Sequence, residues 1–173
     1  MNRGLKLLVS VGAALAETAL RQRRKANQPA PPVTDDYPGD FTGVPQITWA
    51  PRQGRDADPG EVVWTWVPYE EDHSKGKDRP VLLIGRDGPW LLGLPLTSKD
   101  HDRDAAQEAR EGRYWVDIGT GSWDSRGRPS EARVDRIIHV APGKVRRTGD
   151  ALPKDCFDVV SRHVMEHVAR DGR

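Results

Sequence analysis

The sequence has few of the features that indicate a disulfide, a metal site or a large additional domain. Of its 173 residues only one is a cysteine, Cys156, which excludes an internal disulfide, and no CxxC or His-rich neighbour gives it metal-ligand spacing. Hydrophobic residues make up 36%, a low share that predicts one domain with additions that pack little. We therefore expect a cytoplasmic protein with a single folded domain and with no cofactor or structural metal.

A strong charge of one sign is also missing. The 27 Lys and Arg residues balance 26 Asp and Glu residues, so no global field indicates a nucleic-acid or membrane partner. The charges are unevenly distributed: residues 1–28 hold six basic and one acidic residue, residues 29–72 two basic and nine acidic, and residues 73–173 nineteen basic and sixteen acidic. An acidic segment therefore lies between two basic ones.

No apolar run is long enough to span a bilayer. The first run ends near Ala16 and contains Ser10 and Gly12, which leaves it short of the ~18 to 20 residues that a span needs. Its apolar residues recur at helical spacing, and "RQRRK" at 21–25 suits a helix C-terminus. We predict a docked or peripheral helix over residues 1–25, with a signal sequence or disorder as the alternatives.

An extended linker is predicted for residues 26–59. The stretch 26–60 carries half of the 14 prolines and shows little apolar periodicity, so it cannot bury enough surface to offset its ordering entropy. Four apolar side chains are exceptions that could hold the linker against the domain: Tyr37, Phe41, Ile47 and Trp49.

The segment from Glu61 onward has the pattern of a small β-barrel. Residues 61–67, "EVVWTWV", are largely apolar on both alternating sides, as a barrel strand requires. Two further apolar runs flank Arg86-Asp87-Gly88, and an Asp-Gly pair in that position predicts a hairpin. The predicted strands are 61–67, 79–85, 89–96, 114–119 and 130–140, the last followed by a turn, and the charged residues 100–112 are expected to form a loop or short helix.

The C-terminal residues 152–170 predict one amphipathic helix. Phe157, Val160, Val164 and Val168 recur at helical spacing, which gives the helix a single apolar face that can cover the barrel. The expected fold is thus mainly β, with about five strands and a C-terminal helix in a domain of residues 60–173.

Four short motifs follow one another in this domain: Gly60-Glu61-Val62-Val63-Trp64, Arg79-Pro80, Pro95-Leu96-Thr97-Ser98 and Arg133-Val134-Asp135. Their order resembles that of the MazF/PemK/Kid family of toxin ribonucleases, over about residues 59–168. His73 adds to the likeness, because it stands six residues before Arg79, where the Kid branch carries a histidine implicated at its active site. The resemblance implies an SH3-like barrel that dimerises, cuts single-stranded RNA without metal and pairs with an antitoxin protein.

Attack of a ribose 2′-OH on the adjacent phosphate needs a proton acceptor, a proton donor and cations over the phosphorane. The resemblance implies that Asp135 accepts the proton and that Arg133, which should point into the same groove, stabilises charge. A guanidinium with a pKa above ~12 is a poor acid, so His73 is the expected donor. Arg79 would bind phosphate oxygens and Thr97 would hydrogen-bond phosphate or 2′-OH. Glu61, Ser98 and Arg136 are the candidates for binding RNA.

Each of these residues also has an ordinary structural interpretation. Arg79 could pair with Asp78 or with the acidic residues at 70–72. Asp135 and Arg133 could form a cross-strand pair with Arg136 or Glu131. Four of the domain's tryptophans are expected in the core or in a groove wall, although an exposed one could stack on a base. These are Trp64, Trp66, Trp90 and Trp115.

Departures from the family pattern keep other functions open. Asp78 would weaken the field of Arg79, and Arg136 stands where the family commonly has glutamine. An inactive RNA-binding or protein-interaction barrel is therefore the main alternative, and a gyrase-poisoning toxin of similar fold is the third. The acidic linker is expected either to lie across the groove and occlude it, with its aspartates near the arginines, or to be a solvated tether.

Overall fold

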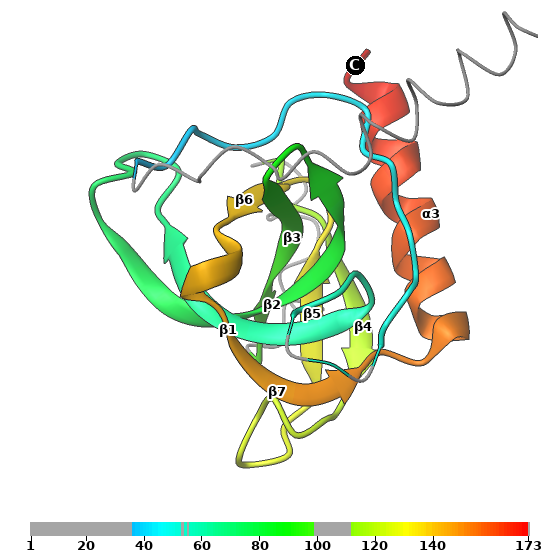
Figure 1. Ribbon diagram of the computed structural model, residues 1–173. Coiled ribbons are helices and arrows are strands. Elements are labelled where there is room, and N and C mark those ends of the chain that lie inside the picture. The colour runs from blue at the N-terminus through cyan, green and yellow to red at the C-terminus, as the bar shows by residue number, and fades with distance from the viewer. Residues whose placement is uncertain (1–35, 53, 55, 99–111, 173) are drawn as a thin grey trace, which may run out of the picture. The chain divides into compact units, whose positions relative to one another are not determined.

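The computed structural model describes residues 36–52, 54, 56–98 and 112–172, and all of them belong to one compact unit. The predicted N-terminal helix, the start of the linker and nearly all of the charged segment 100–112 lie outside the described residues. Within the described part, seven strands precede one long α-helix (Figure 1). The elements are β1 (Glu61–Pro68), β2 (Gly76–Asp87), β3 (Trp90–Thr97), β4 (Trp115–Gly119), β5 (Ser130–Arg133), β6 (Ile138–Val140), the 3-10 turn η2 (Pro142–Lys144), β7 (Arg146–Ala151) and α3 (Lys154–Arg170).

The strands form one strongly curved antiparallel sheet in the order β4-β5-β3-β2-β1-β7, with β6 paired to β3 beside β5. Every pairing is antiparallel, and the helix α3 packs beside the sheet and contacts β4 (Figure 1). The predicted fold class, mainly β with a small barrel-like sheet and a C-terminal helix, is confirmed, although the described sheet has seven strands and not about five.

The hairpin between β2 and β3 is confirmed, with its turn one residue later than predicted. Asp87 pairs with Trp90, so the two turn residues are Gly88 and Pro89. Gly88 has φ of +54°, in the left-handed region that favours glycine. Pro89 has no N–H to donate, and it is tolerated here because it lies in the turn, outside the paired residues of the ladder.

The predicted single strand over 130–140 is wrong. β5 ends at Arg133, and β6 begins at Ile138 and pairs with the other half of β3. Val134 and Ile137 lie between the two strands, and both are buried. In one continuous strand, residues three positions apart would point to opposite faces, so these two side chains would not share a face. The break leaves Arg133 at the end of a strand. The edge strand β7 was also missed, because "RRTGDA" has neither apolar alternation nor β-branched residues beyond one threonine.

The core lies between the inner face of the sheet and α3. Phe157, Val160, Val164 and Val168 are each at most 3% exposed, as the helical periodicity predicts. They pack with buried residues of β1, β2, β3 and β5 in one cluster, and a smaller cluster on the other side of the sheet contains Val63, Val81 and Leu83 among others. Burying one such side chain contributes about 1.5–3 kcal/mol, so this face of α3 fixes the helix on the sheet.

The segment 36–58 is extended, as predicted, but it is not a free tether. It runs beside α3 before entering β1 (Figure 1), and its backbone joins the sheet through hydrogen bonds from Phe41 N–H to the Ile137 carbonyl (2.8 Å) and from Thr48 N–H to the Ile84 carbonyl (2.9 Å). A Cβ at Gly85 would lie 2.5 Å from the Gln46 carbonyl oxygen, so glycine is needed where the segment crosses β2.

The four predicted anchors of this segment contact the domain. Phe41 and Ile47 pack against the larger core cluster and Tyr37 against the smaller one. The indole N–H of Trp49 donates to the Leu152 carbonyl at 2.9 Å. The folded domain therefore includes at least residues 36–58, in addition to the predicted domain from residue 60 onward.

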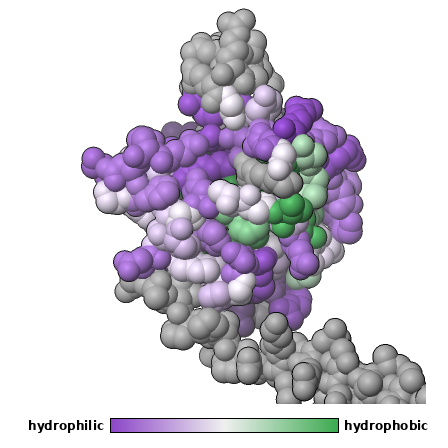
Figure 2. Space-filling model, turned by 90° about the horizontal axis from the view of Figure 1, so that it is seen from above, coloured by the Kyte–Doolittle hydropathy of each residue, from purple (hydrophilic) through white to green (hydrophobic). Residues whose placement is uncertain are grey.

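The surface seen from above is mostly hydrophilic, with one compact hydrophobic patch (Figure 2). Among the helices of the described residues, none has both the length and the hydrophobicity required to cross a bilayer.

Candidate active site

Strand register brings the polar ends of three strands to one rim of the sheet. Val81 pairs with Pro95, so the same register extended by two residues places Arg79 opposite Thr97. On the other side of β3, Thr97 pairs with Glu131, and Arg133 lies two residues further along the same face of β5. The two apolar runs of the hairpin thus position Arg79 and Thr97 side by side, with Arg133 nearby.

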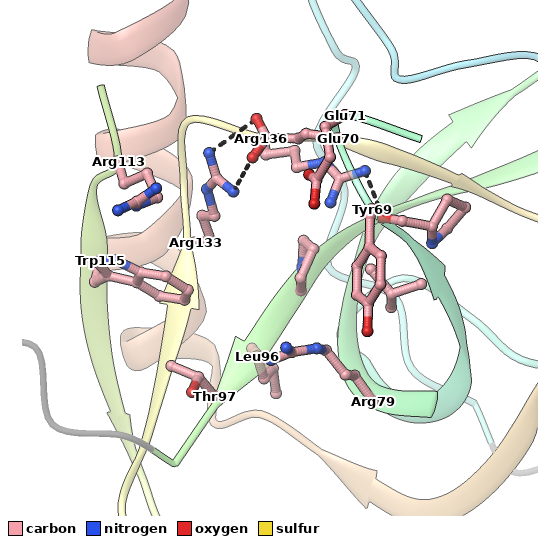
Figure 3. A pocket seen from close by; sticks show the side chains of 13 residues that line it. Tyr69, Glu70, Glu71, Arg79, Leu96, Thr97, Arg113, Trp115, Arg133 and Arg136 are labelled. Atoms are coloured by element: carbon pink, nitrogen blue, oxygen red, sulfur yellow. Dashed lines mark hydrogen bonds and ion pairs between the residues drawn. The ribbon is translucent and has the colours of Figure 1, made fainter. Parts of the chain in front are cut away.

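These side chains line a pocket of about 310 Å³, here called the active-site pocket. Figure 3 shows Arg79 extending across it from β2 toward Leu96 and Thr97, with Arg133 and Trp115 on the opposite wall. Its lining residues are Val67, Pro68, Tyr69, Glu70, Glu71, Arg79, Pro95, Leu96, Thr97, Arg113, Trp115, Arg133 and Arg136. Arg79 and Thr97 also line an adjoining pocket of about 220 Å³, which contains Ser98.

Arg133 is held between two carboxylates. Its Nε and Nη2 donate to Oδ2 of Asp135 at 2.9 and 2.7 Å, and its Nη1 and Nη2 donate to the two carboxylate oxygens of Glu70 at 2.7 and 3.1 Å. Burial disfavours the charge of Arg133, but these hydrogen bonds outweigh it and raise its pKa. Arg133 is therefore a permanent cation, suited to stabilising negative charge and unsuited to donating a proton.

Asp135 lies behind Arg133. Its side chain is 6% exposed, and Oδ1 accepts the Tyr114 N–H at 2.7 Å. Because β5 ends at Arg133, Asp135 is outside the strand and is not among the described residues that line the pocket. The expectation that both side chains point into one groove is thus wrong for Asp135, whose carboxylate instead fixes the orientation of Arg133.

Arg136 is also paired and buried. Its Nε and Nη2 donate to Asp40 at 2.7 and 3.1 Å, and Nη2 donates to the Pro68 carbonyl at 2.8 Å. The Tyr37 hydroxyl donates to the same Asp40 carboxylate. Burial of Asp40 favours its protonated form, but the hydrogen bonds from Arg136 and Tyr37 and the charge of Arg136 lower its pKa overall.

Arg79 differs from the other two arginines. No other described residue forms a side-chain hydrogen bond or ion pair with it, and it is only half-buried. Asp78, its neighbour in sequence, points to the opposite side of the strand and pairs with Arg146. The alternative in which Arg79 pairs with Asp78 is therefore not what the structure has, and Arg79 lines the pocket.

Two predicted site residues lie elsewhere. His73 is exposed in the loop between β1 and β2, lines a different pocket and packs its ring edge-on against Tyr37 with centroids 5.0 Å apart. Glu61 is 4% exposed at the start of β1, where its backbone N–H donates to the Asp58 carbonyl. The structure therefore brings together Arg79, Thr97, Ser98, Arg133 and Arg136 and leaves His73 and Glu61 outside this group.

Sequence reasoning missed Glu70 as the partner of Arg133. The acidic run at 70–72 was considered only as a partner of Arg79, which is closer in sequence. Arg113 and Tyr69 in the pocket wall were also missed, and nothing in their local pattern distinguishes them from surface residues.

The predicted occlusion of the groove by the acidic segment is not what the described residues show. Among the aspartates of the segment, Asp40 does bind Arg136, but Asp58 pairs with Arg52 and Arg86, away from the pocket. The residues that line the active-site pocket all follow residue 60. Asp35, one of the predicted occluding residues, lies outside the described part of the chain.

The fold and the pocket together define a small mainly β protein with an arginine-rich pocket at one rim of its sheet. The chain belongs to the family of PemK-like, MazF-like toxins of type II toxin-antitoxin systems, whose model matches residues 58–168. The resemblance inferred from the motifs is thereby confirmed.

Among solved structures, one similar chain belongs to the crystal structure of MazE-MazF (Form-II) from Deinococcus radiodurans. It is 15% identical, with a TM-score of 0.44, and the match covers 65% of this chain and 95% of that one. A comparison with curated proteins found no match.

Proposed function

We propose that this protein is an endoribonuclease toxin that cuts single-stranded RNA by attack of a ribose 2′-OH on the adjacent phosphate. The observation that supports this most directly is the convergence of Arg79, Arg133 and Thr97 on one pocket of a MazF-like domain. Two cations and a hydroxyl around a volume of about 310 Å³ suit a phosphodiester with its neighbouring sugar.

The arginines would stabilise the charge that develops in the transition state. Attack of the 2′-oxygen adds negative charge to the non-bridging oxygens of the phosphate. Cations that are already in position stabilise this charge and so lower the activation barrier of the attack. Arg79 faces the pocket and would bind a phosphate oxygen directly. Arg133 is oriented by Asp135 and can meet the same phosphate once Glu70 moves aside.

The proton acceptor has two candidates. Asp135 remains the residue that the family resemblance implies, although its carboxylate is buried behind Arg133. Glu70 lies in the pocket itself, and its carboxylate is 49% exposed. His73 stays the proposed donor to the departing 5′-oxygen, and that role requires it to reach the pocket from the neighbouring one.

The proposed partners follow from the family. A toxin of a type II toxin-antitoxin system is paired with an antitoxin. We propose that an antitoxin protein covers the pocket and that this protein acts as a homodimer in the cytoplasm. Every catalytic role is assigned to a side chain, so we expect cleavage to proceed in EDTA.

Cleavage by the purified full chain tests this function. We expect single-stranded RNA to be cut in the presence of EDTA and to carry 5′-OH ends. Arg79→Ala and Arg133→Ala should each lower the rate by ~10² or more, while Arg170→Ala, which removes an exposed arginine at the far end of α3, should not change it. If folded wild-type protein and both pocket variants are equally inert and bind RNA equally well, the protein is an RNA-binding barrel and not a nuclease.

A further inference from the structure

A second pocket, here called the aromatic pocket, adjoins the active-site pocket and is lined mainly by rings. Its volume is about 260 Å³. Pro68 lines both pockets, so they meet at the end of β1. The rings around it are Tyr37, Trp66, His73, Trp90 and His139, and Lys144 lies at its edge.

Three of these rings are held in place by contacts with neighbouring groups: His139, Trp90 and Tyr37. His139 is bound through Nδ1 to the Gly39 carbonyl at 2.7 Å and through Nε2 to Asp87 at 3.0 Å. Trp90 packs edge-on against His139, with ring centroids 5.9 Å apart. Tyr37 is fixed by its hydrogen bond to Asp40. The pocket is therefore preformed, which reduces the ordering cost of binding a ligand.

Trp66 is unusual among these residues because it is large, apolar and 55% exposed. Its indole lies against the backbone of β2 at Gly76, where a Cβ would come within 2.6 Å of Nε1. The glycine allows the ring to rest on the strand, in a position where most of its surface faces solvent. A ring in that position contributes little to the core and remains available to a ligand.

The two pockets are also connected through one set of hydrogen bonds. Arg136, in the wall of the active-site pocket, donates to Asp40 and to the Pro68 carbonyl, and Asp40 accepts the Tyr37 hydroxyl of the aromatic pocket. Tyr37 precedes the residues 58–168 that match the family, so the segment before the matched domain completes this pocket.

We propose that the aromatic pocket binds one nucleobase of the single-stranded RNA whose phosphate occupies the active-site pocket. This inference rests on the proposed function. A flat, apolar base fits a ring-lined pocket, base stacking on aromatic side chains tolerates any sequence, and Lys144 at the edge suits a backbone phosphate. Trp66 is the main stacking residue, and Tyr37 and Trp90 form the walls.

The test measures binding of the full chain to RNA that cannot be cut because its 2′-hydroxyls are methylated. A dinucleotide reaches only the active-site pocket, and a hexanucleotide reaches both. Trp66→Ala should weaken hexanucleotide binding by about tenfold and leave dinucleotide binding unchanged, as loss of one stacked base predicts. Trp66→Phe should restore most of the loss, and Met165→Ala, which truncates an exposed apolar residue on α3, should change neither.

A second measurement identifies the base. Replacing one nucleotide of the hexanucleotide at a time with an abasic residue should weaken wild-type binding about tenfold at one position and cause no further loss in Trp66→Ala. Unchanged hexanucleotide binding by Trp66→Ala, or an equal loss for both lengths, would overturn the inference. If wild-type protein shows this Trp66 dependence but never cuts RNA, the aromatic pocket stands and the nuclease proposal fails. If it cuts RNA but Trp66→Ala leaves RNA binding unchanged, the nuclease proposal stands and the aromatic-pocket inference fails.

Discussion

The carboxylate of Glu70 occupies the outer end of the Arg133 guanidinium, with two hydrogen bonds of 2.7 and 3.1 Å. Both side chains line the active-site pocket, and Figure 3 shows the guanidinium and the carboxylate joined by these bonds. Burial of the Glu70 carboxyl favours its protonated form, but the hydrogen bonds and charge of Arg133 outweigh this and lower its pKa. At neutral pH an anion of the protein thus holds the position that the proposed function assigns to a phosphate.

Replacing Glu70 with glutamine should release Arg133 for RNA. We expect Glu70→Gln to tighten binding of uncleavable RNA by about fivefold, because the phosphate no longer competes with a charged partner. The neighbouring Glu71→Gln, which removes the same charge from the same pocket wall, is the matched control and should have a smaller effect. Equal effects of the two variants would show that only net charge matters.

Cleavage by Glu70→Gln then distinguishes the two candidate proton acceptors. If Asp135 accepts the proton, the variant should cut at least as fast as wild type at limiting substrate. If Glu70 accepts it, binding should tighten while the single-turnover rate falls by ~10² or more.

Asp135→Asn should lower the cleavage rate by ~10² through the orientation of Arg133. The asparagine keeps the shape but loses the charge that holds the guanidinium. If Asp135 acts only through Arg133, the double variant Asp135→Asn/Arg133→Ala should be no slower than Arg133→Ala alone. A further loss in the double variant would show that Asp135 has its own role at the reacting atoms.

The Asp40–Arg136 pair should make stability depend on acid pH. The Arg136 side chain is only 8% exposed, so Asp40→Asn leaves its buried charge poorly compensated. The substitution should lower the free energy of unfolding by about 2–3 kcal/mol at pH 7. The folded-state pKa of Asp40 is below its unfolded value of about 3.9, so the contribution is complete above that pH and is lost as pH falls through the folded pKa. Urea unfolding of wild-type protein and Asp40→Asn at pH 7 and near pH 3 measures this. The difference between their free energies of unfolding should be smaller at the lower pH. A gap that is constant or grows in acid would contradict the assignment.

Removing the segment before β1 should destabilise the domain. A chain of residues 60–173 lacks Asp40, the Phe41 and Ile47 side chains that pack on the core, and the Trp49 bond to Leu152. Together these losses are expected to exceed about 5 kcal/mol, which is a large part of a typical domain's stability. A chain of residues 32–173 should unfold at the same urea concentration as the full protein, whereas 60–173 should be partly or wholly unfolded. Equal midpoints for all three would mean that the segment only rests on the surface.

Several elements follow from sequence because their signals are local. The spacing of Phe157, Val160, Val164 and Val168 determines one face of α3, and the glycine in the turn between two apolar runs determines the β2–β3 hairpin. The apolar strands and the order of the motifs around Arg79 and Arg133 were sufficient to indicate the family. Periodicity and turn chemistry act over a few residues, so a single sequence displays them.

The pairing of charges was decided only by the tertiary structure. Arg133 binds Glu70, 63 positions earlier, in addition to Asp135, two positions later. Arg136 binds Asp40, 96 positions earlier. The split between β5 and β6, which ends the strand at Arg133, likewise depends on β3 pairing with both along its length. An isolated charge has no local preference among partners. Which carboxylate meets which arginine is set by how the sheet curves and by where the segment 36–58 crosses it, and that depends on contacts summed over the whole domain.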